Sequence, residues 1–142
     1  MSIAHAVATR STCDRKHVGC VLVLDRRIIS SGYNGSIPGA PHCDGVGHDL
    51  VKVEASHGVV AHNCVRTMHA EANAIAQAAR FGSPTHGAHA YVNTFPCWPC
   101  FRLLASSGIE HIIYDDDYRE DARVRDGAAH AKIVITQLRG CT

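Results

Sequence analysis

Two segments near the start of the chain have the character of strands. Residues 18–24 read Val-Gly-Cys-Val-Leu-Val-Leu, and residues 28–33 read Ile-Ile-Ser-Ser-Gly-Tyr and end at Asn34-Gly35. Since β-branched and apolar residues favour the extended backbone, each run predicts a strand. Residues 25–27 between them predict a turn, which makes the two strands antiparallel. Residues 3–9, just upstream, are typical of the end of a helix.

An Ala-rich segment gives the strongest helix prediction. Residues 67–81 contain Glu and Gln among the alanines, lack Pro and Gly, and are followed by Gly82, which favours a helix end. Residues 98–106 predict a second, shorter helix that ends before Gly108. Three further strands are predicted at residues 88–93, 109–114 and 132–135, with a helical or irregular stretch between the last two.

The order of strands and helices indicates an α/β fold, a mixed sheet with helices on its faces. The first two strands are antiparallel, and right-handed crossovers make the later strands parallel. Residues 36–63 form no predicted element and contain Gly, His and Pro throughout. A loop of this length in a compact domain is either functional or held by something other than a hydrophobic core, and its own His and Cys residues indicate a metal.

The length, charge and cysteine count narrow the class of protein. The 142 residues suit one domain, residues 1–142, because no linker or repeat divides them. The net charge of +1, without a basic run, favours a small anionic ligand over long nucleic acid. No apolar stretch is long enough for a bilayer, and residues 1–10 lack the pattern of a signal peptide. Since seven cysteines cannot all pair, we expect a cytoplasmic protein whose Cys and His bind metal.

Two short motifs carry the candidate chemistry. His69 and Glu71 open the first predicted helix, and Cys97 and Cys100 open the second. A catalytic zinc ion takes three protein ligands and leaves its fourth position to water, so His69 and the two cysteines suit one ion. The helix dipole helps to keep the thiols deprotonated. Glu71 is two positions from His69 and points elsewhere, so we expect it to move protons at the activated water instead of binding the ion.

The joint pattern, His-x-Glu followed by Pro-Cys-x-x-Cys, is typical of zinc-dependent nucleobase deaminases. Other interpretations compete with it. A Cys-x-x-Cys alone also occurs in structural zinc knuckles and in redox pairs. From a different class, the pattern also fits a zinc-stabilised binding module without catalysis. Glu71 argues against that module, because a structural site has no use for a carboxylate beside the metal.

The chain resembles the deoxycytidylate (dCMP) deaminases of the cytidine deaminase superfamily. The zinc motifs are shared by the superfamily, whereas Gly-Tyr-Asn-Gly at residues 32–35 and Cys-Val-Arg-Thr at residues 64–67 are closer to the dCMP branch. The resemblance extends along most of the chain, through Arg10-Ser11-Thr12-Cys13-Asp14-Arg15, Val18-Gly19, Gly39, Pro41, His42, Cys43, residues 64–71, Asn73-Ala74-Ile75, Tyr91-Val92, residues 96–100 and Ser107-Gly108-Ile109.

The resemblance implies a three-layer α-β-α sandwich around a mixed five-stranded sheet. It also implies hydrolysis of dCMP to dUMP and ammonia, in which zinc-activated water attacks C4 of cytosine and Glu71 carries protons to N3 and the leaving amine. Asn34 matches the superfamily asparagine that binds the sugar or base. Ser11 and Arg15 are candidates for the 5′-phosphate, because a guanidinium suits phosphate. Tyr118 stands where the family often has an aromatic that faces the ligand. An ordinary surface arginine and an interface tyrosine are the alternative roles.

Many relatives also carry a structural zinc beside the catalytic one. The positions that match its ligands, with His48 where relatives often have a Cys, are Cys13, Cys43, His48 and Cys64. The resemblance thus implies a closed tetrahedral site that pins the long loop to the first strand and the catalytic helix. His57 and His62 are rival fourth ligands, and small core residues are the alternative role of the cysteines.

Partners and regulation follow from the resemblance alone. Relatives are often hexamers activated by dCTP and inhibited by dTTP. The implied partners are therefore these effectors, with Mg²⁺ accompanying the nucleotide, and further copies of the chain. The residues do not separate dCMP from dCTP, a 5-modified dCMP or a free nucleoside as substrate. Neither long nucleic acid nor a membrane is expected as a partner.

Overall fold

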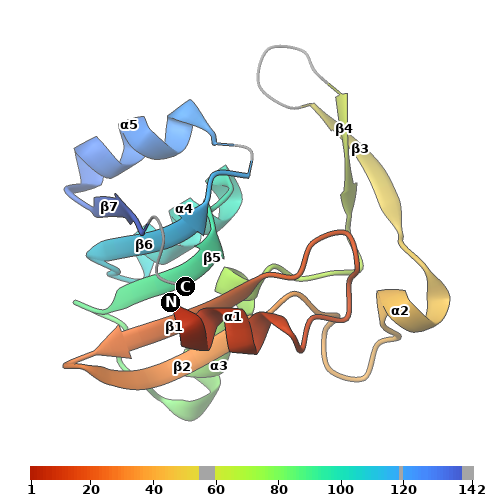
Figure 1. Cartoon of the computed structure of the whole chain (residues 1–142), viewed down its shortest axis with the longest axis horizontal. Coiled ribbons are helices and arrows are strands. Elements are labelled where there is room, and N and C mark those ends of the chain that lie inside the picture. The colour runs from red at the N-terminus through yellow and green to blue at the C-terminus, as the bar shows by residue number, and fades with distance from the viewer. Residues whose placement is uncertain (55–59, 119, 139–142) are drawn as a thin grey trace.

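A mixed five-stranded sheet lies at the centre of the structure, a computed structural model that describes residues 1–54, 60–118 and 120–138 (Figure 1). Across the sheet the strands are β2 (Arg27–Tyr33), β1 (Gly19–Leu24), β5 (His89–Thr94), β6 (His111–Asp116) and β7 (Val134–Gln137). β1 is antiparallel to both of its neighbours, whereas β5, β6 and β7 are parallel. The predicted mixed five-stranded sheet is therefore confirmed.

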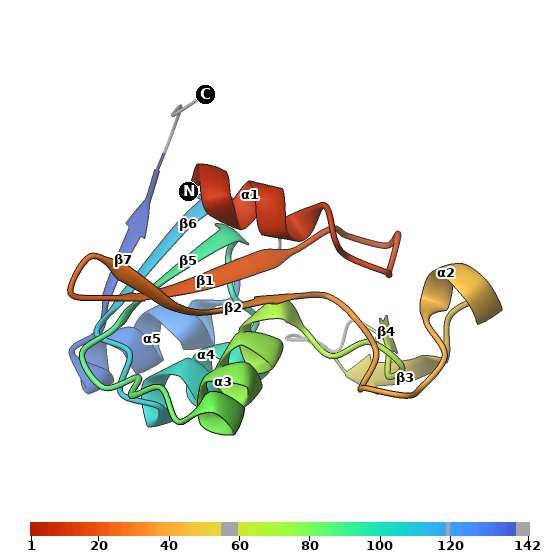
Figure 2. The same cartoon turned by 90° about the horizontal axis from the view of Figure 1, so that it is seen from below.

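Helices cover both faces of this sheet (Figure 2). One face carries α1 (Ser2–Ala8), and the other carries α3 (Ala70–Phe81), α4 (Trp98–Ser106) and α5 (Ala122–Ala131). α3 packs on β2 and β1, and α4 contacts both α3 and α5. The predicted α-β-α sandwich is thus confirmed. None of the helices in the described ranges has the length and hydrophobicity that crossing a bilayer requires.

Two glycines on the sheet let helices come close to it. Gly32 of β2 faces α3, where an added Cβ would lie 2.2 Å from the Ala70 carbonyl oxygen. Gly19 of β1 faces α1, with the same spacing to the Ala4 carbonyl oxygen. The alanines of α3 that face the sheet are buried as well. The Ala-rich sequence that predicts this helix therefore also sets its short distance from the sheet.

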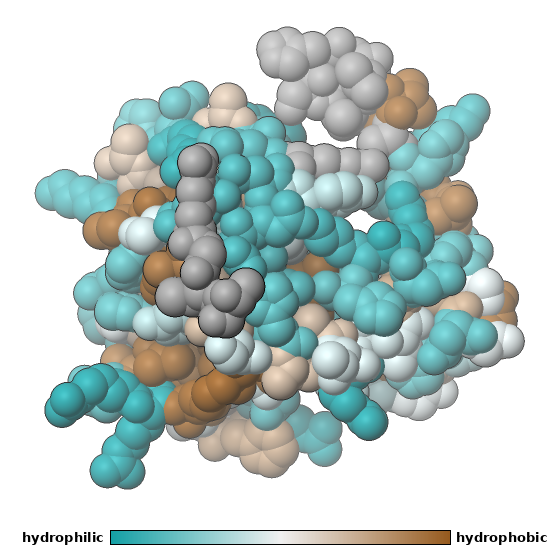
Figure 3. Space-filling view, viewed as in Figure 1, coloured by the Kyte–Doolittle hydropathy of each residue, from teal (hydrophilic) through white to brown (hydrophobic). Residues whose placement is uncertain are grey.

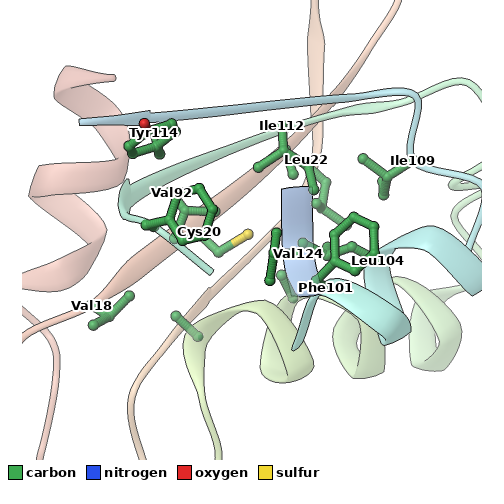
Figure 4. Close-up of a cluster of buried hydrophobic side chains, with 14 of the residues drawn as sticks. Val18, Cys20, Leu22, Val92, Phe101, Leu104, Ile109, Ile112, Tyr114 and Val124 are labelled. Atoms are coloured by element: carbon green, nitrogen blue, oxygen red, sulfur yellow. The ribbon is translucent and has the colours of Figure 1, made fainter. Parts of the chain in front are cut away.

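The core lies between the sheet and the layer of three helices (Figure 4). Leu22 of β1 and Ile112 of β6 are completely buried, and they pack with Leu104 of α4 and Val124 of α5. Burying a side chain of this size stabilises the fold by about 1.5–3 kcal/mol. Cys20 is also completely buried in this cluster, so it is a core residue, as the apolar strand predicts.

α3 begins later than the sequence predicts. Residues 67–69 are not helical: Met68 pairs with Gly35 in an isolated antiparallel bridge, and His69 is extended, with φ −71° and ψ 153°. Helix propensity is a local property, so it cannot predict a pairing between residues that lie far apart in the chain. β6 and β7 are also displaced toward the C-terminus from their predicted ranges, and α5 fills the stretch between them.

Residues 36–63, which the sequence predicts as a long loop, are not structureless. They contain a short helix, α2 (Cys43–Val46), and an antiparallel hairpin of β3 (Leu50–Glu54) and β4 (Val60–Cys64). The hairpin stands apart from the central sheet (Figures 1 and 2). It has little core, because Leu50 and Val60 are 50% and 56% exposed. Figure 3 shows one face of the whole molecule, where apolar residues form separate patches among hydrophilic ones. Strands paired without burial leave little hydrophobic pattern, which explains the wrong prediction.

Candidate active site at two helix N-termini

The structure brings His69, Cys97 and Cys100 together where α3 and α4 begin. His69 immediately precedes α3, Cys97 immediately precedes α4, and Cys100 lies in the first turn of α4. His69 Nδ1 is 3.4 Å from the Sγ atoms of both cysteines. Three ligand atoms at this spacing can bind one metal ion.

Hydrogen bonds from the sheet hold both helix starts in place. Asn34, just after β2, accepts through Oδ1 from the N–H of Ala70 at 3.0 Å. Phe95, just after β5, donates its N–H to the carbonyl of Asp116 at the end of β6 at 2.8 Å. The three ligand side chains are therefore carried by regular elements of the sandwich, which fixes their geometry better than loops do.

The donor set suits zinc. One imidazole and two thiolates are ligands that zinc prefers, and three protein ligands leave one coordination position open. Hydrogen bonds from Cys100 and from His69 lower the pKa of Cys97 to about 4. The hydrogen bond to Cys97 in turn raises the pKa of His69 to about 9, and Cys97 also raises the pKa of Cys100. Metal binding to such a set releases the protons that His69 and Cys100 hold.

Glu71 lies in the first turn of α3, near the three ligand atoms but not among them. The residue is only 3% exposed. Burial raises the pKa of its carboxyl, the nearby Cys97 raises it further, and His69 opposes the shift. A carboxyl group with a raised pKa can both take up and release a proton near neutral pH, as general acid–base catalysis requires.

A cavity of about 250 Å³ opens beside His69 and Glu71. Of the predicted ligand-binding residues, Asn34, Arg15 and Tyr118 line this cavity. Ser11 is not among the lining residues. Its hydroxyl donates to the backbone carbonyls of Cys13 and Asn34 at 3.2 Å. The structure thus uses the Ser11 side chain to hold the backbone near the cavity.

Two of these residues also make structural hydrogen bonds. Asn34 donates through Nδ2 to the Lys16 carbonyl at 2.9 Å, in addition to accepting from α3. Arg15 donates through Nη2 to the His62 carbonyl in β4 at 2.7 Å. A guanidinium has five N–H donors, so one backbone contact leaves Arg15 with further donors for a ligand.

Sequence reasoning missed part of the cavity wall. The additional lining residues are Lys16, Val18, Asn63, Thr67, Thr94, Phe95 and Pro99. Lys16 is the one with a usable signal, because it is a second cation directly after Arg15. The others reach the cavity only through the fold, for example at the end of β5, and no local pattern indicates this.

A second group of metal-ligand side chains adjoins the same cavity, which Cys13 and Cys64 help to line. Cys13, Cys43 and His48 place their ligand atoms within 4.8 Å of one another. Cys64 Sγ is 3.6 Å from Cys43 Sγ. His48 turns Nδ1 toward Cys13 Sγ, at 3.9 Å, while its Nε2 lies 3.0 Å from a carboxylate oxygen of Asp14. A carboxylate on the outer ring nitrogen is the usual support of a metal-binding histidine.

The rival fourth ligands have different positions. His62 contributes its backbone carbonyl to Arg15 and is not in a group of three or more metal-ligand side chains among the described residues. His57 lies outside the described residues. Of the four side chains that the resemblance implies for a second metal, Cys13, Cys43 and His48 form one group, and Cys64 contacts it through Cys43.

Comparison with known proteins identifies the family. Residues 1–115 match the cytidine and deoxycytidylate deaminase zinc-binding region. The chain belongs to this family. Over 138 residues it is 38% identical to ComE operon protein 2 of Bacillus subtilis (strain 168), covering 97% of this chain and 68% of that protein. Over 117 residues it is 41% identical to a deoxycytidylate deaminase of Mycobacterium phage D29, covering 80% of this chain and 89% of that protein.

Solved structures give the same assignment of the fold. The dCMP deaminase from the cyanophage S-TIM5, in complex with dCMP and dUMP, superposes with a TM-score of 0.76 at 22% identity. The match covers 96% of this chain and 92% of that chain. The arrangement of sheet and helices is thus that of the deaminase family.

Proposed function

We propose that this deaminase converts dCMP and water to dUMP and ammonia. The observation that carries the proposal is the buried Glu71 beside His69, Cys97 and Cys100, in a cavity that Arg15 also lines. This arrangement combines a metal site, a proton-carrying acid and a phosphate-binding cation. The phage relative named deoxycytidylate deaminase, at 41% identity, supports the choice of substrate.

The proposed chemistry places each residue in one role. His69, Cys97 and Cys100 would hold a zinc ion, which would supply the Lewis acidity that makes water nucleophilic near neutral pH. Glu71 accepts a proton from the attacking water and passes it to N3 of cytosine as the oxygen adds to C4. Glu71 then takes the remaining proton from the oxygen on C4 and delivers it to the amino group. As the C4=O bond forms, the C4–N bond breaks and ammonia leaves. The raised pKa of the buried carboxyl suits both directions of transfer.

The substrate contacts remain proposals as well. Asn34 binds the sugar or base with the N–H that its two backbone contacts leave over. Arg15 binds the 5′-phosphate, and Tyr118 packs against the ligand at the cavity wall. Charge-assisted contacts from a guanidinium to phosphate are about twice as strong as neutral hydrogen bonds, which gives Arg15 the larger share of affinity.

A second, structural zinc is the finer part of the metal proposal. Cys13, Cys43, His48 and Cys64 would hold it, with Asp14 behind His48. The ion would connect the loop before β1, the short α2 and the end of β4, which share little hydrophobic core. Its chemistry would be structural only, because four protein ligands close the coordination shell.

Assembly, regulation and location are proposed from the family alone. We expect a cytoplasmic homo-oligomer, by resemblance a hexamer, of a single-domain chain over residues 1–142. dCTP and dTTP, with Mg²⁺, are the expected effectors. Light scattering after size-exclusion chromatography, with and without dCTP and Mg²⁺, measures the assembly. A monomer under all conditions would contradict this proposal.

One assay tests the proposed activity. The purified protein is analysed for zinc, and ammonia release is followed from dCMP, dCTP, deoxycytidine and cytidine. We expect dCMP to have the highest kcat/KM. Preference for dCTP would replace the substrate while keeping the reaction. Zinc-loaded protein that turns over none of the four would favour the non-catalytic binding module.

A further inference from the structure

Lys16 connects the wall of the cavity to the end of β6. Its ammonium nitrogen Nζ lies 2.5 Å from Oδ2 of Asp116 and 3.8 Å from the centroid of the Tyr118 ring. Both Lys16 and Tyr118 line the cavity that holds Glu71. The side chain of Lys16 is 25% exposed, whereas that of Asp116 is 60% exposed. The ammonium therefore lies at the wall of the cavity, with its counter-ion on the solvent side.

The backbone ties Lys16 to both helix starts of the active site. Its carbonyl accepts from Asn34, the residue that also accepts from the first N–H of α3. The carbonyl of Asp116 accepts from Phe95, just before α4. Hydrogen bonds connect the Lys16 backbone to the start of α3 through Asn34, and the Asp116 backbone to Phe95, two residues before Cys97. The backbone of Lys16 is thus anchored beside the start of α3, while its side chain remains free to reorient.

The charges at this end of the cavity are few. Among the described residues, the lining cations other than histidine are Arg15 and Lys16. The neighbouring acids are engaged elsewhere: Asp115 contacts His5, and Asp117 accepts from Gln137. Asp116 is therefore the carboxylate that pairs with Lys16. It takes the place that a bound anion could have beside this ammonium group.

We propose that Lys16, with Asp116 as its built-in counter-ion, determines that the substrate carries a single phosphate. This inference rests on the proposed deamination of a cytosine nucleotide. A monophosphate between Arg15 and Lys16 satisfies two cations and draws the ammonium away from Asp116. Further phosphates extend toward the exposed Asp116 carboxylate, whose negative charge repels them. The pair thus favours a monophosphate over both a nucleoside and a triphosphate.

The alternative is an ordinary surface ion pair. Such a pair contributes about 0–1 kcal/mol to stability and has no effect on ligand choice. The Lys16→Met variant separates the two roles, because Met keeps the apolar stem and removes the charge. Lys16→Arg keeps the charge and serves as the conservative control.

The first measurement is steady-state kinetics with dCMP and deoxycytidine. In the Lys16→Met variant, we expect KM for dCMP to rise about tenfold, the value of one charge-assisted hydrogen bond, while kcat changes little. The same variant should alter kcat/KM for deoxycytidine far less, and Lys16→Arg should recover most of the lost affinity for dCMP. Equal losses on nucleotide and nucleoside, or no loss on either, would overturn the proposal.

The second measurement tests the counter-ion with dCTP. In Asp116→Asn, kcat/KM for dCTP relative to dCMP should rise about threefold, because one repulsive charge is removed. Asp117→Asn is the matched control, since Asp117 contacts Gln137 and not Lys16, and it should leave the ratio unchanged. A ratio that rises equally in both variants would reduce the effect to general surface charge and contradict the proposal.

Measurements of ligand binding test the phosphate site even if the protein does not deaminate dCMP. Isothermal titration calorimetry of the wild type and of Lys16→Met is carried out with dUMP and with deoxyuridine. The wild type should bind dUMP more tightly, and Lys16→Met should lose most of this difference. If the wild type binds dUMP more tightly than deoxyuridine but does not turn over dCMP, the proposed activity is refuted and the proposed phosphate site is supported. Similar affinities of the wild type for both compounds would refute the site.

Discussion

The two Cys/His clusters adjoin one cavity but are built in opposite ways. His69, Cys97 and Cys100 lie at the starts of helices that pack on a sheet, so the core positions them. The second cluster joins the loop before β1, the short α2 and the end of β4, and the hairpin of β3 and β4 is largely exposed. In the first case the fold shapes the metal site, and in the second the proposed metal shapes the fold. Changes in the two clusters should therefore have different consequences.

The largest expected effect belongs to chemistry at the first cluster. Glu71→Gln keeps the shape of the side chain but cannot carry a proton, so kcat should fall by about 10³-fold. Zinc content should stay at the wild-type value, because Glu71 is not among the ligand atoms. Ammonia release and metal analysis on the same sample measure both. Near-normal turnover would refute the role of Glu71.

The second-largest effect should come from a change in the packing of α3 on the sheet, because His69 directly precedes this helix. Gly32→Ala places a Cβ 2.2 Å from the Ala70 carbonyl oxygen, so α3 must move. We expect a loss of about 3 kcal/mol in the free energy of unfolding, measured with urea. Gly45→Ala in α2 is the control, because an added Cβ there meets nothing within 4 Å. If both variants unfold alike, the close packing of α3 does not govern stability.

Changes in the second cluster should loosen the segment around that cluster more than they destabilise the central sheet. Cys43→Ser should remove one of two bound zinc ions and speed proteolysis within residues 36–64 about tenfold, since the metal-supported contacts are lost. Cys20→Ala, which changes a buried cysteine outside both clusters, should retain both ions. One zinc per wild-type chain would remove the second metal from the proposal.

The smallest effect should come from a site that belongs to neither cluster. Asp121 caps α5 by accepting from the N–H of Arg123 at 3.0 Å, and Asp121→Ala should cost about 1 kcal/mol of stability. Hydrogen bonds from Arg123 lower the pKa of Asp121. The contribution is therefore complete above the ordinary pKa of Asp and is lost as the pH falls through the lowered folded pKa. Urea unfolding at neutral and acidic pH should show the difference between wild type and variant shrinking in acid. A constant difference would contradict the cap.

The sequence predicted the sandwich and the first cluster well, because both depend on local patterns. Apolar runs indicate the strands, alanines indicate α3, and each zinc motif lies at the start of a helix. The hairpin of β3 and β4 was missed because backbone pairing holds it without burial. Lys16 was missed because its partners, Asp116 and Tyr118, are about a hundred positions away and only the fold joins them.

The two hydrogen bonds of the Asn34 side chain restrict which residues position 34 can tolerate. One end of the carboxamide must accept from the backbone of α3 while the other donates to the Lys16 carbonyl. An ionised aspartate, although nearly isosteric, offers two acceptors and would turn a negative oxygen toward that carbonyl. The two-sided character of a single amide thus sets the alignment of α3 and the loop before β1, and a charged look-alike would push them apart.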